Sequence, residues 1–498
     1  MNYTIQNKNL DKNRVFILQK SELEKRLDPQ TYHTERRNII NALKKSGHKL
    51  ETLKFVSSFN KNIVKEIPEN LPYLGLENIE SNTGSYIQTN EKESISSAIL
   101  FDKGKVLFPK LRPYLNKVYF AEFDGVCSTE FHILDSKKVS NEYLANFLRT
   151  NLVVNQTKYL MSGNTLPRLQ TEDIESLLIP ILPKEKEDLI NEIMRDAFAH
   201  KKQSEAEANK LLASIDDYLL SELGITLPVE HNVEYAISSY QGFELNKHNS
   251  VVKKGRLFLT RHSEIEGGRF DPKLYKKVTK DLLNALNHSK YPRTTLKSII
   301  IQSISGDWGI DDIENYDTTE FVRCLVIRAT EFDNKGNLNV ESNRAKFRLI
   351  AKQKYTTLNI RTGDLLIEKS GGSENQPVGR IAILSKELTE QYILGYSNFV
   401  HKIRIDTNRA YPEFVFNYLK TLHNIKVTNV MQSQTNGIRN LILNEYFALP
   451  ISLPPLDKQQ EIITHISEIR KQAKFLQIEA TNILETAKQK VEQIILSK

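Results

Sequence analysis

The sequence predicts an α+β protein in which two tandem, homologous mixed α/β domains are each followed by a long helix. Two observations predict this fold class. Residues 184–223 and 457–498 are proline-free stretches whose apolar residues follow a helical repeat, and the segments that precede them also occur twice. The repeat has a period of about 250 residues, which is far too long for a solenoid. A duplicated domain with its helix therefore predicts a pseudo-twofold symmetric molecule.

The two long stretches have the spacing of a coiled-coil seam. In residues 457–498, apolar or small residues alternate at steps of four and three for about four heptads. Residues 184–223 follow the same pattern with a polar middle at 200–209. Each helix would be about 60 Å long. The predicted seam and partner-docking positions are Leu189, Ile193, Leu211, Ile215, Ile462, Ile466, Ile469 and Ile483.

The ends of these helices are marked by residues that stop or delay a helix. Pro454 and Pro455 stand just before the second helix, and the residue before a proline avoids the α region. Gly224 follows the first helix and suits a C-cap. The entries to the two helices match when Leu189 is aligned with Ile462, an offset of 273 residues.

The repeat sets the domain organisation. We predict a flexible tail at 1–14, a first domain at 15–183, a first helix at 184–223, a connector at 224–255, a second domain at 256–456 and a second helix at 457–498. In the first domain we expect strands at 105–108, 117–120 and 130–134 and helices at 32–45 and 141–152. In the second we expect strands at 322–328, 364–368, 380–384 and 401–405 and a helix at 411–422.

Composition limits the class of protein only loosely. The chain has 498 residues, 39% of them hydrophobic, which is ample for packed cores. Its net charge of +8 permits a polyanionic partner without requiring one. Cys127 and Cys324 are expected to be buried, reduced thiols of a cytoplasmic protein. No apolar run approaches the length of a membrane span.

A turn in the first domain is a candidate for binding DNA. Between Gly104 and Lys117 a predicted strand leads into a turn held open by two prolines and rich in side chains suited to phosphates and base edges. A solvated basic turn is the alternative interpretation. The candidate DNA-binding residues here are Lys110, Arg112, Tyr114, Asn116 and Lys117.

The second domain carries a counterpart of this turn. Gly363 aligns with Gly104 and Lys369 with Lys110 at a constant separation of 259 residues, which makes Lys369 and Ser370 candidates as well. Two polar loops, which end in Arg168 and Arg439 before the long helices, are a third candidate site. A flexible glycine turn and ordinary surface loops remain open as alternatives for these segments.

Motifs that would indicate catalysis or metal binding are incomplete. Asp28-Pro29 and Asp271-Pro272 lack the second proline of the amino-methyltransferase signature. The acidic Asp364 and Glu368 precede Lys369 without the spacing of a nuclease triad, because adjacent strand residues point to opposite faces. We therefore predict that the chain has no catalytic site and no metal site, and that it needs no cofactor itself.

Several runs together resemble the specificity subunits of type I restriction-modification systems. They are Phe108–Leu134, Tyr73–Ser81, Ser370–Leu384, the Arg-x-Asp-Pro openings at Arg26 and Arg269, and the proline-rich entries to both helices. The resemblance implies two target recognition domains, each reading one half of a split double-stranded DNA sequence. It also implies that the two helices pack antiparallel and dock two modification (methyltransferase) subunits. Restriction subunits that translocate and cut DNA would join them, and S-adenosylmethionine, ATP and Mg would bind to these partners.

The physical reading agrees with the resemblance. B-DNA turns once in about 34 to 36 Å, so two readers must be held at a fixed distance and rotation, and a coiled coil can hold them. Two other functions stay open. The chain could be an adaptor that holds partner proteins without reading DNA, or it could contain a cryptic methyltransferase.

Overall fold

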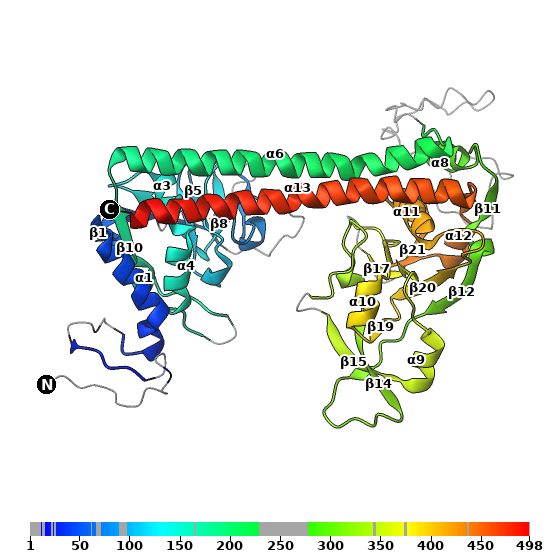
Figure 1. The fold of residues 1–498 in the computed structure, drawn as a ribbon, viewed down its shortest axis with the longest axis horizontal. Helices are drawn as coiled ribbons and strands as arrows, with labels where there is room; N and C mark the ends of the chain where they lie inside the picture. The colour runs from blue at the N-terminus through cyan, green and yellow to red at the C-terminus, as the bar shows by residue number, and fades with distance from the viewer. Residues whose placement is uncertain are drawn as a thin grey trace, which may run out of the picture. The chain divides into compact units, whose positions relative to one another are not determined.

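The computed structural model describes residues 11, 15–20, 23, 26–60, 62–65, 71–88, 97–163, 166–228, 277–341, 345–372, 376–435 and 438–497. Most of the expected tail and connector, and the second Arg-x-Asp-Pro motif at Arg269, lie outside these residues. The chain divides into two compact units (Figure 1). The first unit comprises residues 1–208 and 474–498, and the second comprises residues 209–473. Each unit therefore contains one mixed domain and a part of both long helices.

The first unit has short helices around small sheets in which all described strand pairs except one, β4 (Tyr73–Leu74) with β8 (Gly125–Ser128), are antiparallel. A single helix was expected at 141–152, but the chain breaks there because Thr150 is extended and its hydroxyl donates to the Phe147 carbonyl. The helical elements are η2 (Pro29–Tyr32), α1 (Thr34–Lys45), α2 (Leu53–Val56), η3 (Leu76–Asn78), η4 (Pro113–Leu115), α3 (Asn141–Leu148), α4 (Asn151–Lys158), α5 (Thr171–Glu175) and the long α6 (Lys184–Leu223).

The strands of the first unit form two four-stranded sheets and one pair. The strands are β1 (Lys49–Thr52), β2 (Ser57–Asn60), β3 (Ile63–Val64), β4 (Tyr73–Leu74), β5 (Ala98–Phe101), β6 (Val106–Pro109), β7 (Tyr119–Phe120), β8 (Gly125–Ser128), β9 (Phe131–Ser136) and β10 (Leu178–Ile181). Their orders are β2-β9-β6-β7, β3-β5-β8-β4 and β1-β10. The three strands expected at 105–108, 117–120 and 130–134 correspond to β6, β7 and β9.

The second unit has a similar plan and an additional three-stranded sheet. Its helical elements are α8 (Lys277–Leu286), η7 (Leu296–Ile299), η8 (Ala329–Glu331), α9 (Lys352–Leu358), α10 (Lys386–Gln391), α11 (Pro412–Asn424), η9 (Val427–Val430), α12 (Leu443–Phe447) and the long α13 (Leu456–Leu496). Its strands are β11 (Arg293–Thr295), β12 (Ile300–Ser305), β13 (Ile310–Asp311), β14 (Phe321–Ile327), β15 (Lys346–Ala351), β16 (Leu365–Glu368), β17 (Ser370–Gly372), β18 (Ile381–Ile383), β19 (Leu394–Tyr396), β20 (Val400–Ile405), β21 (Gln432–Thr435), β22 (Ile438–Leu441) and β23 (Pro450–Ser452).

One sheet has the same strand order in both units. The order β12-β20-β16-β18 matches β2-β9-β6-β7. Gly104 and Gly363 both have φ near +80° before the third strand, where glycine is favoured. Their amides donate to Ala121 and Leu384, each at 2.8 Å. The predicted alignment of the two glycines is thus reproduced by the backbone.

The other four-stranded sheet is assembled differently in the two units. We equate β4 with β14, since a 3-10 turn follows each and is capped by Asn78 or Glu331. We equate β8 with β19, since each is the parallel partner of that strand. The strand that joins this parallel pair is β5 in the first unit and β15 in the second. On this assignment β5 pairs with β8, whereas β15 pairs with β14, the counterpart of β4. Of the two four-stranded sheets in each domain, one is therefore the same in both domains and the other differs.

At the entries to the long helices, the offset between the two copies is 272 residues, not the 273 predicted. Leu53 donates to the Leu177 carbonyl at 2.8 Å, and Leu296 donates to the Leu449 carbonyl at 3.0 Å. The long helices begin at Lys184 and Leu456 with the same separation. Ile190, rather than Leu189, is therefore the counterpart of Ile462. Leu189 is 45% exposed, whereas Ile190 is fully buried, because a shift of one residue turns a helical side chain by about 100°.

The long helices pair antiparallel. In the first unit, the core that contains Ile190 and Ile193 from the start of α6 also contains Ile483 from the end of α13. In the second unit, Ile215 and the partly buried Leu211 from the end of α6 share a core with Ile462, Ile466 and Ile469 from the start of α13. In each unit this seam is continuous with the core of the mixed domain.

Each long helix is also tied to its domain by a buried polar residue near its start. The Glu187 carboxylate accepts from the Ser140 amide at 3.1 Å, and the Gln459 side-chain oxygen accepts from the Tyr411 amide at 2.9 Å. Ser140 and Tyr411 are the N-caps of α3 and α11. In the polar middle of α6, Lys201 donates to Glu80 of the first domain at 2.8 Å. Polar residues of the helices thus orient the domains.

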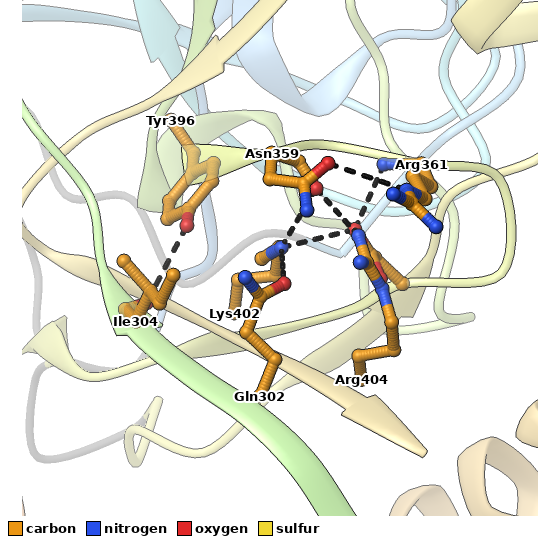
Figure 2. Close-up of polar contacts among 8 residues, drawn as sticks. Gln302, Ile304, Asn359, Arg361, Tyr396, Lys402 and Arg404 are labelled. Carbon is orange, nitrogen blue, oxygen red and sulfur yellow. Dashed lines mark hydrogen bonds and ion pairs between the residues drawn. The ribbon is translucent and has the colours of Figure 1, made fainter. Parts of the chain in front are cut away.

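An ion pair at equivalent positions of the shared sheet has opposite polarity in the two units. Lys105 pairs with Asp135 at 2.7 Å, whereas Asp364 pairs with Arg404 at 2.7 Å. In the second pair Asp364 is buried and also binds Lys402, whose ammonium group donates to Gln302 at 2.6 Å and to the Asn359 carbonyl (Figure 2). Burial lowers the pKa of Lys402 to about 8, an effect that Asp364 partly offsets.

The Lys402 cluster predicts a pH-dependent stability. Because the folded-state pKa of Lys402, about 8, lies below its ordinary value of 10.5, the unfolded chain binds this proton more tightly between those values. Relative to Lys402→Met, the wild-type chain should therefore gain stability as the pH rises from about 7 to about 9.5. Denaturant unfolding of both chains at each pH measures the difference. A difference that stays constant with pH would contradict the prediction.

The seam predicts the effect of a buried charge. Ile469→Asp places an unpaired carboxylate at a position only 8% exposed, which should destabilise the second unit by on the order of 3 kcal/mol or more. Thermal unfolding followed by circular dichroism measures this loss. The matched control is Leu189→Asp, which lies on an exposed face of α6 and should leave the melting temperature nearly unchanged.

Candidate nucleic-acid interface

In the first unit, the backbone joins the basic turn to the polar loop that ends in Arg168. The Leu169 amide donates to the Lys110 carbonyl at 2.9 Å, and the Arg112 amide donates to the Pro167 carbonyl at 2.8 Å. Leu111 and Arg168 also form an isolated β-bridge. Two of the predicted clusters are therefore one surface, although they lie far apart in the sequence.

The side chains of this turn differ in their accessibility. Arg112 and Tyr114 are exposed, and Arg112 has a positive φ of 48° that leads into η4. Asn116 is only 4% exposed and donates to the Arg149 carbonyl at 2.8 Å. The Asn116 amide thus holds the turn from inside, and a DNA contact by this side chain stays a prediction.

Lys117 and Arg168 each have a partner within the chain. The Lys117 ammonium group donates to the Leu76 carbonyl at 2.8 Å, and burial lowers its pKa against the opposing effect of Glu77. Lys117 therefore supports the fold of the turn. Arg168 pairs with Glu130 at 2.7 Å, but half of its side chain remains exposed. Lys110 is partly buried.

The second unit has the same backbone junction. Lys369 donates its amide to the Phe399 carbonyl and accepts from the Leu441 amide, both at 2.8 Å. In the first unit Lys110 donates to Glu130 at 2.8 Å and accepts from Leu169 in the same way. The predicted equivalence of Lys110 and Lys369 thus has a physical basis.

The candidate side chains of the second junction are partly occupied. The Lys369 ammonium group donates to the Ser305 hydroxyl at 2.8 Å, and burial lowers its pKa. Ser370 is 6% exposed and its hydroxyl donates to Asn440 at 2.6 Å, while a DNA contact by this hydroxyl stays a prediction. Arg439 lies on β22 opposite Gly372 and is partly exposed.

The glycines after Lys369 are explained by packing. A Cβ atom at Gly372 would lie 2.6 Å from the Gln376 carbonyl oxygen. Gly371 has a φ of 113°, a conformation that side-chain-bearing residues rarely adopt. The close approach at Gly372 is to the chain's own backbone, so the glycines need no bound phosphate to account for them.

Both carboxylates that were considered for catalysis are held in ion pairs. Asp364 is bound by Lys402 and Arg404, as described above. Glu368 is 1% exposed and forms two hydrogen bonds with Arg380, at 2.8 and 2.9 Å. Arg380 also donates to the Ala329 and Phe332 carbonyls and so links the end of β16 to η8. These carboxylates organise the second domain.

A buried histidine repeats at the same place in both sheets. His132 lies opposite Phe108 on β6, and His401 lies opposite Ile367 on β16. His401 shares a hydrogen bond with Ser303 at 2.8 Å, and burial together with Lys369 lowers its pKa to about 4. No local spacing in the sequence marks these two histidines, because they are related only by the repeat.

Three further cationic or aromatic residues were missed from the sequence. Trp308, Arg328 and Arg348 form a cluster in the second unit, with guanidinium carbons 4.8 Å (Arg348) and 6.0 Å (Arg328) from the indole centre. The signal that could have found them is that Trp308 is the chain's single tryptophan and stands between two glycines, Gly306 and Gly309. The two arginines are distant in sequence and give no local signal.

The described residues contain neither a metal-binding group nor a membrane-spanning helix. Within them, no three His, Cys, Asp or Glu side chains are grouped so that they could hold a metal ion. None of the helices in the described part of the chain is both long and apolar enough to cross a membrane.

Comparisons with known proteins agree on one family. A curated relative, the type I restriction enzyme EcoDI specificity subunit of Escherichia coli, is 30% identical over 157 residues. This match covers 31% of the chain and spans about a third (35%) of the relative's length.

Solved structures of similar chains belong to type I restriction-modification systems. A chain from a study of complex assembly and conformational transition of such a system is 16% identical, with a TM-score of 0.44, and covers 90% of this chain and 96% of its own. The HsdS subunit from Thermoanaerobacter tengcongensis is 15% identical with a TM-score of 0.31, and the match covers 90% and 95% of the two chains. The S subunit from M. genitalium is 14% identical with a TM-score of 0.36, and covers 89% and 95%.

The family assignment rests on a sequence model that matches twice. The type I restriction modification DNA specificity domain matches residues 53–213 and again residues 311–486. The two matches cover more than half of the chain, and each includes one basic junction and a part of one long helix. The chain therefore belongs to the type I restriction-modification DNA specificity family, with two tandem copies of its recognition domain.

Proposed function

We propose that this chain is the DNA sequence-specificity subunit of a type I restriction-modification complex. Each domain reads one half of a bipartite target in double-stranded DNA. The observation that carries the proposal is the duplicated junction, in which Lys110 and Lys369 follow the same core strand and are fixed by the same two backbone hydrogen bonds. Beside each junction lies the arginine that ends the polar loop of that unit, Arg168 in the first and Arg439 in the second.

The pairing of the long helices supports a spacing role. Two readers must meet the duplex at a fixed distance and rotation, because B-DNA turns once in about 34 to 36 Å. The seam is continuous with each domain core, and Glu187 and Gln459 anchor each helix to its domain. A rigid connection of this kind transmits the geometry of the helices to the readers.

The chemistry would then be carried out by the partners. Asp364 and Glu368 are neutralised by Lys402, Arg404 and Arg380, which supports a recognition role without catalysis in this chain. Methyl transfer to an extruded base would belong to bound modification subunits that use S-adenosylmethionine. Cleavage with ATP and Mg would belong to restriction subunits. The complex would act in the cytoplasm.

The long helices offer an apolar surface for docking the modification subunits. Phe475 and Ile478 on α13 are 66% and 51% exposed, and they line a groove of about 470 Å³ with Ile193 and Ile483. Leu189 is exposed on α6. Apolar side chains with this much exposure on a helix pair are typical of a protein–protein contact.

Exchange of one domain tests the reading function. If residues 15–183 are replaced by the corresponding domain of a relative, only one half of the methylated motif should change, and the gap between the halves should stay constant. Sequencing of modified bases in a host that carries the chain with its methyltransferase measures both. An adaptor that does not read DNA would leave the motif unchanged, and that outcome would overturn the proposal.

A charge in the groove tests the docking surface. Phe475→Asp should abolish co-purification of the modification subunits, because it places a carboxylate in the apolar contact. The melting temperature of the chain should change little, since Phe475 is exposed. Gln472→Asp, at an exposed position nearby on α13, is the control and should retain the partners. Retention of the partners by Phe475→Asp would place the contact elsewhere.

A further inference from the structure

Differences between the two copies are the places to look for sequence discrimination. The shared sheet, the junctions at Lys110 and Lys369 and the buried histidines occur in both units, so they cannot by themselves select different half-sites. The second unit has a longer connection, residues 306–309, between β12 and β13. The corresponding connection between β2 and β3 is residues 61–62. This longer turn carries Trp308.

The backbone holds the Trp308 turn rigidly. The Gly306 amide donates to Val400 at 3.2 Å, and the Asp307 amide donates to Tyr396 at 2.8 Å. The Asp307 carboxylate accepts from the Gly309 amide at 2.7 Å. A Cβ atom at Gly306 would lie 2.2 Å from the Tyr396 carbonyl oxygen, so only glycine permits this close approach.

Arg348 fixes the same turn from the neighbouring strand. Its Nε donates to the Trp308 carbonyl at 2.7 Å, and its Nη2 donates to the Gly309 carbonyl at 3.2 Å. Its Nη1 pairs with Asp311 at 2.7 Å. The guanidinium group lies 4.8 Å from the indole centre, which is within the range of a cation–π contact.

Trp308 remains accessible although its surroundings are fixed. The side chain is 39% exposed, and the Arg328 guanidinium carbon lies 6.0 Å from the ring centre. Arg328 is oriented by Glu331 at 3.1 Å. The carboxylates of Asp307, Asp311 and Glu331 are thus all engaged within the cluster. A rigid, exposed aromatic beside cations can bind without the entropic cost of ordering a loop.

The Trp308 turn adjoins the basic junction of its domain. Ser305, which accepts a hydrogen bond from Lys369 at 2.8 Å, is three residues before Trp308. Three residues span at most about 10 Å between Cα atoms. The Trp308 backbone therefore lies within about 10 Å of the residue that binds the Lys369 ammonium group, and the repeat identifies Lys369 as part of the candidate interface.

We propose that Trp308 contacts bases of the DNA half-site read by the second domain, with Arg328 beside it facing the DNA. This inference rests on the proposed function and deepens it. Bases stack on aromatic side chains, and apolar side chains can insert at a base step, whereas guanidinium groups bind phosphates and guanine edges. A contact with a protein partner is the competing interpretation, and the test separates the two.

The single tryptophan provides a direct measurement. The full-length chain is titrated with a duplex that carries the methylated motif, and indole emission is recorded together with the anisotropy of labelled DNA. Binding should change the emission of Trp308. Scrambling the second half-site should remove most of this change, whereas scrambling the first half-site should leave it largely intact whenever the DNA is bound.

The outcomes distinguish the inference from the function on which it rests. If the labelled DNA binds with no change in indole emission, the Trp308 inference is overturned while the proposed function stands. If the motif duplex does not bind to the chain alone or with its modification subunits, the proposed function itself fails. A change in emission caused by the modification subunits in the absence of DNA would favour the protein contact and overturn the inference.

Substitutions give a second, independent measurement. Trp308→Ala should raise the dissociation constant for the motif duplex roughly five- to one-hundred-fold, and Trp308→Phe should recover part of this loss because it keeps an aromatic face. Ile313→Ala, at another exposed apolar position of the same domain, is the control and should bind as the wild type does. Equal affinities of Trp308→Ala and the control, with matching melting temperatures, would contradict the inference.

Discussion

Burial of the apolar seam between α6 and α13 is the constraint on which both units depend. In each unit, apolar side chains of both helices belong to the same hydrophobic core as the mixed domain. Burying one isoleucine stabilises a fold by roughly 1.5–3 kcal/mol, so Ile190, Ile462 and Ile466 together contribute a large part of a typical net stability. Because seam and domain cores are continuous, a domain cannot reorient freely on its helices.

Polar contacts then make this attachment specific. An apolar seam alone would tolerate sliding by one turn, since its residues are similar along its length. Glu187 and Gln459 each accept a hydrogen bond from the N-cap of the first helix after the shared sheet, and this contact exists in only one register. Lys201 adds a bond to Glu80 in the first unit. The same division of labour between apolar and polar contacts occurs in both copies.

Comparison of the two copies distinguishes the residues that build the shared scaffold from the segments that differ between the domains. Positions with equivalent contacts in both units, such as Gly104 and Gly363, build the scaffold. The ion pair between Lys105 and Asp135 shows that even a reversed charge pattern, as in Asp364 and Arg404, preserves the scaffold when both partners change together. The copies diverge in the second sheet and in the Trp308 turn. On the proposed function such divergence is expected, because the two domains would read different half-sites.

The sequence by itself determined the two long helices, the repeat and the strands that flank the basic turns. These features are encoded locally, in the spacing of apolar residues and in glycines such as Gly104 that permit a positive φ. The family resemblance also followed from the order of local motifs. All of these signals can be recognised without knowing which segments of the chain pack together.

Only the tertiary structure decided which candidate side chains are free to act. The Asn116 amide donates to the Arg149 carbonyl, 33 residues away in the sequence. The Lys117 ammonium group donates to the Leu76 carbonyl, 41 residues away. The choice of Ile190 over Leu189 as the seam residue required the hydrogen bonds that align the two copies. The position of Trp308 beside Arg328 and Arg348 likewise depends on the packing of segments that are distant in the sequence. Accessibility and partnership depend on contacts between distant segments, and no local pattern records them.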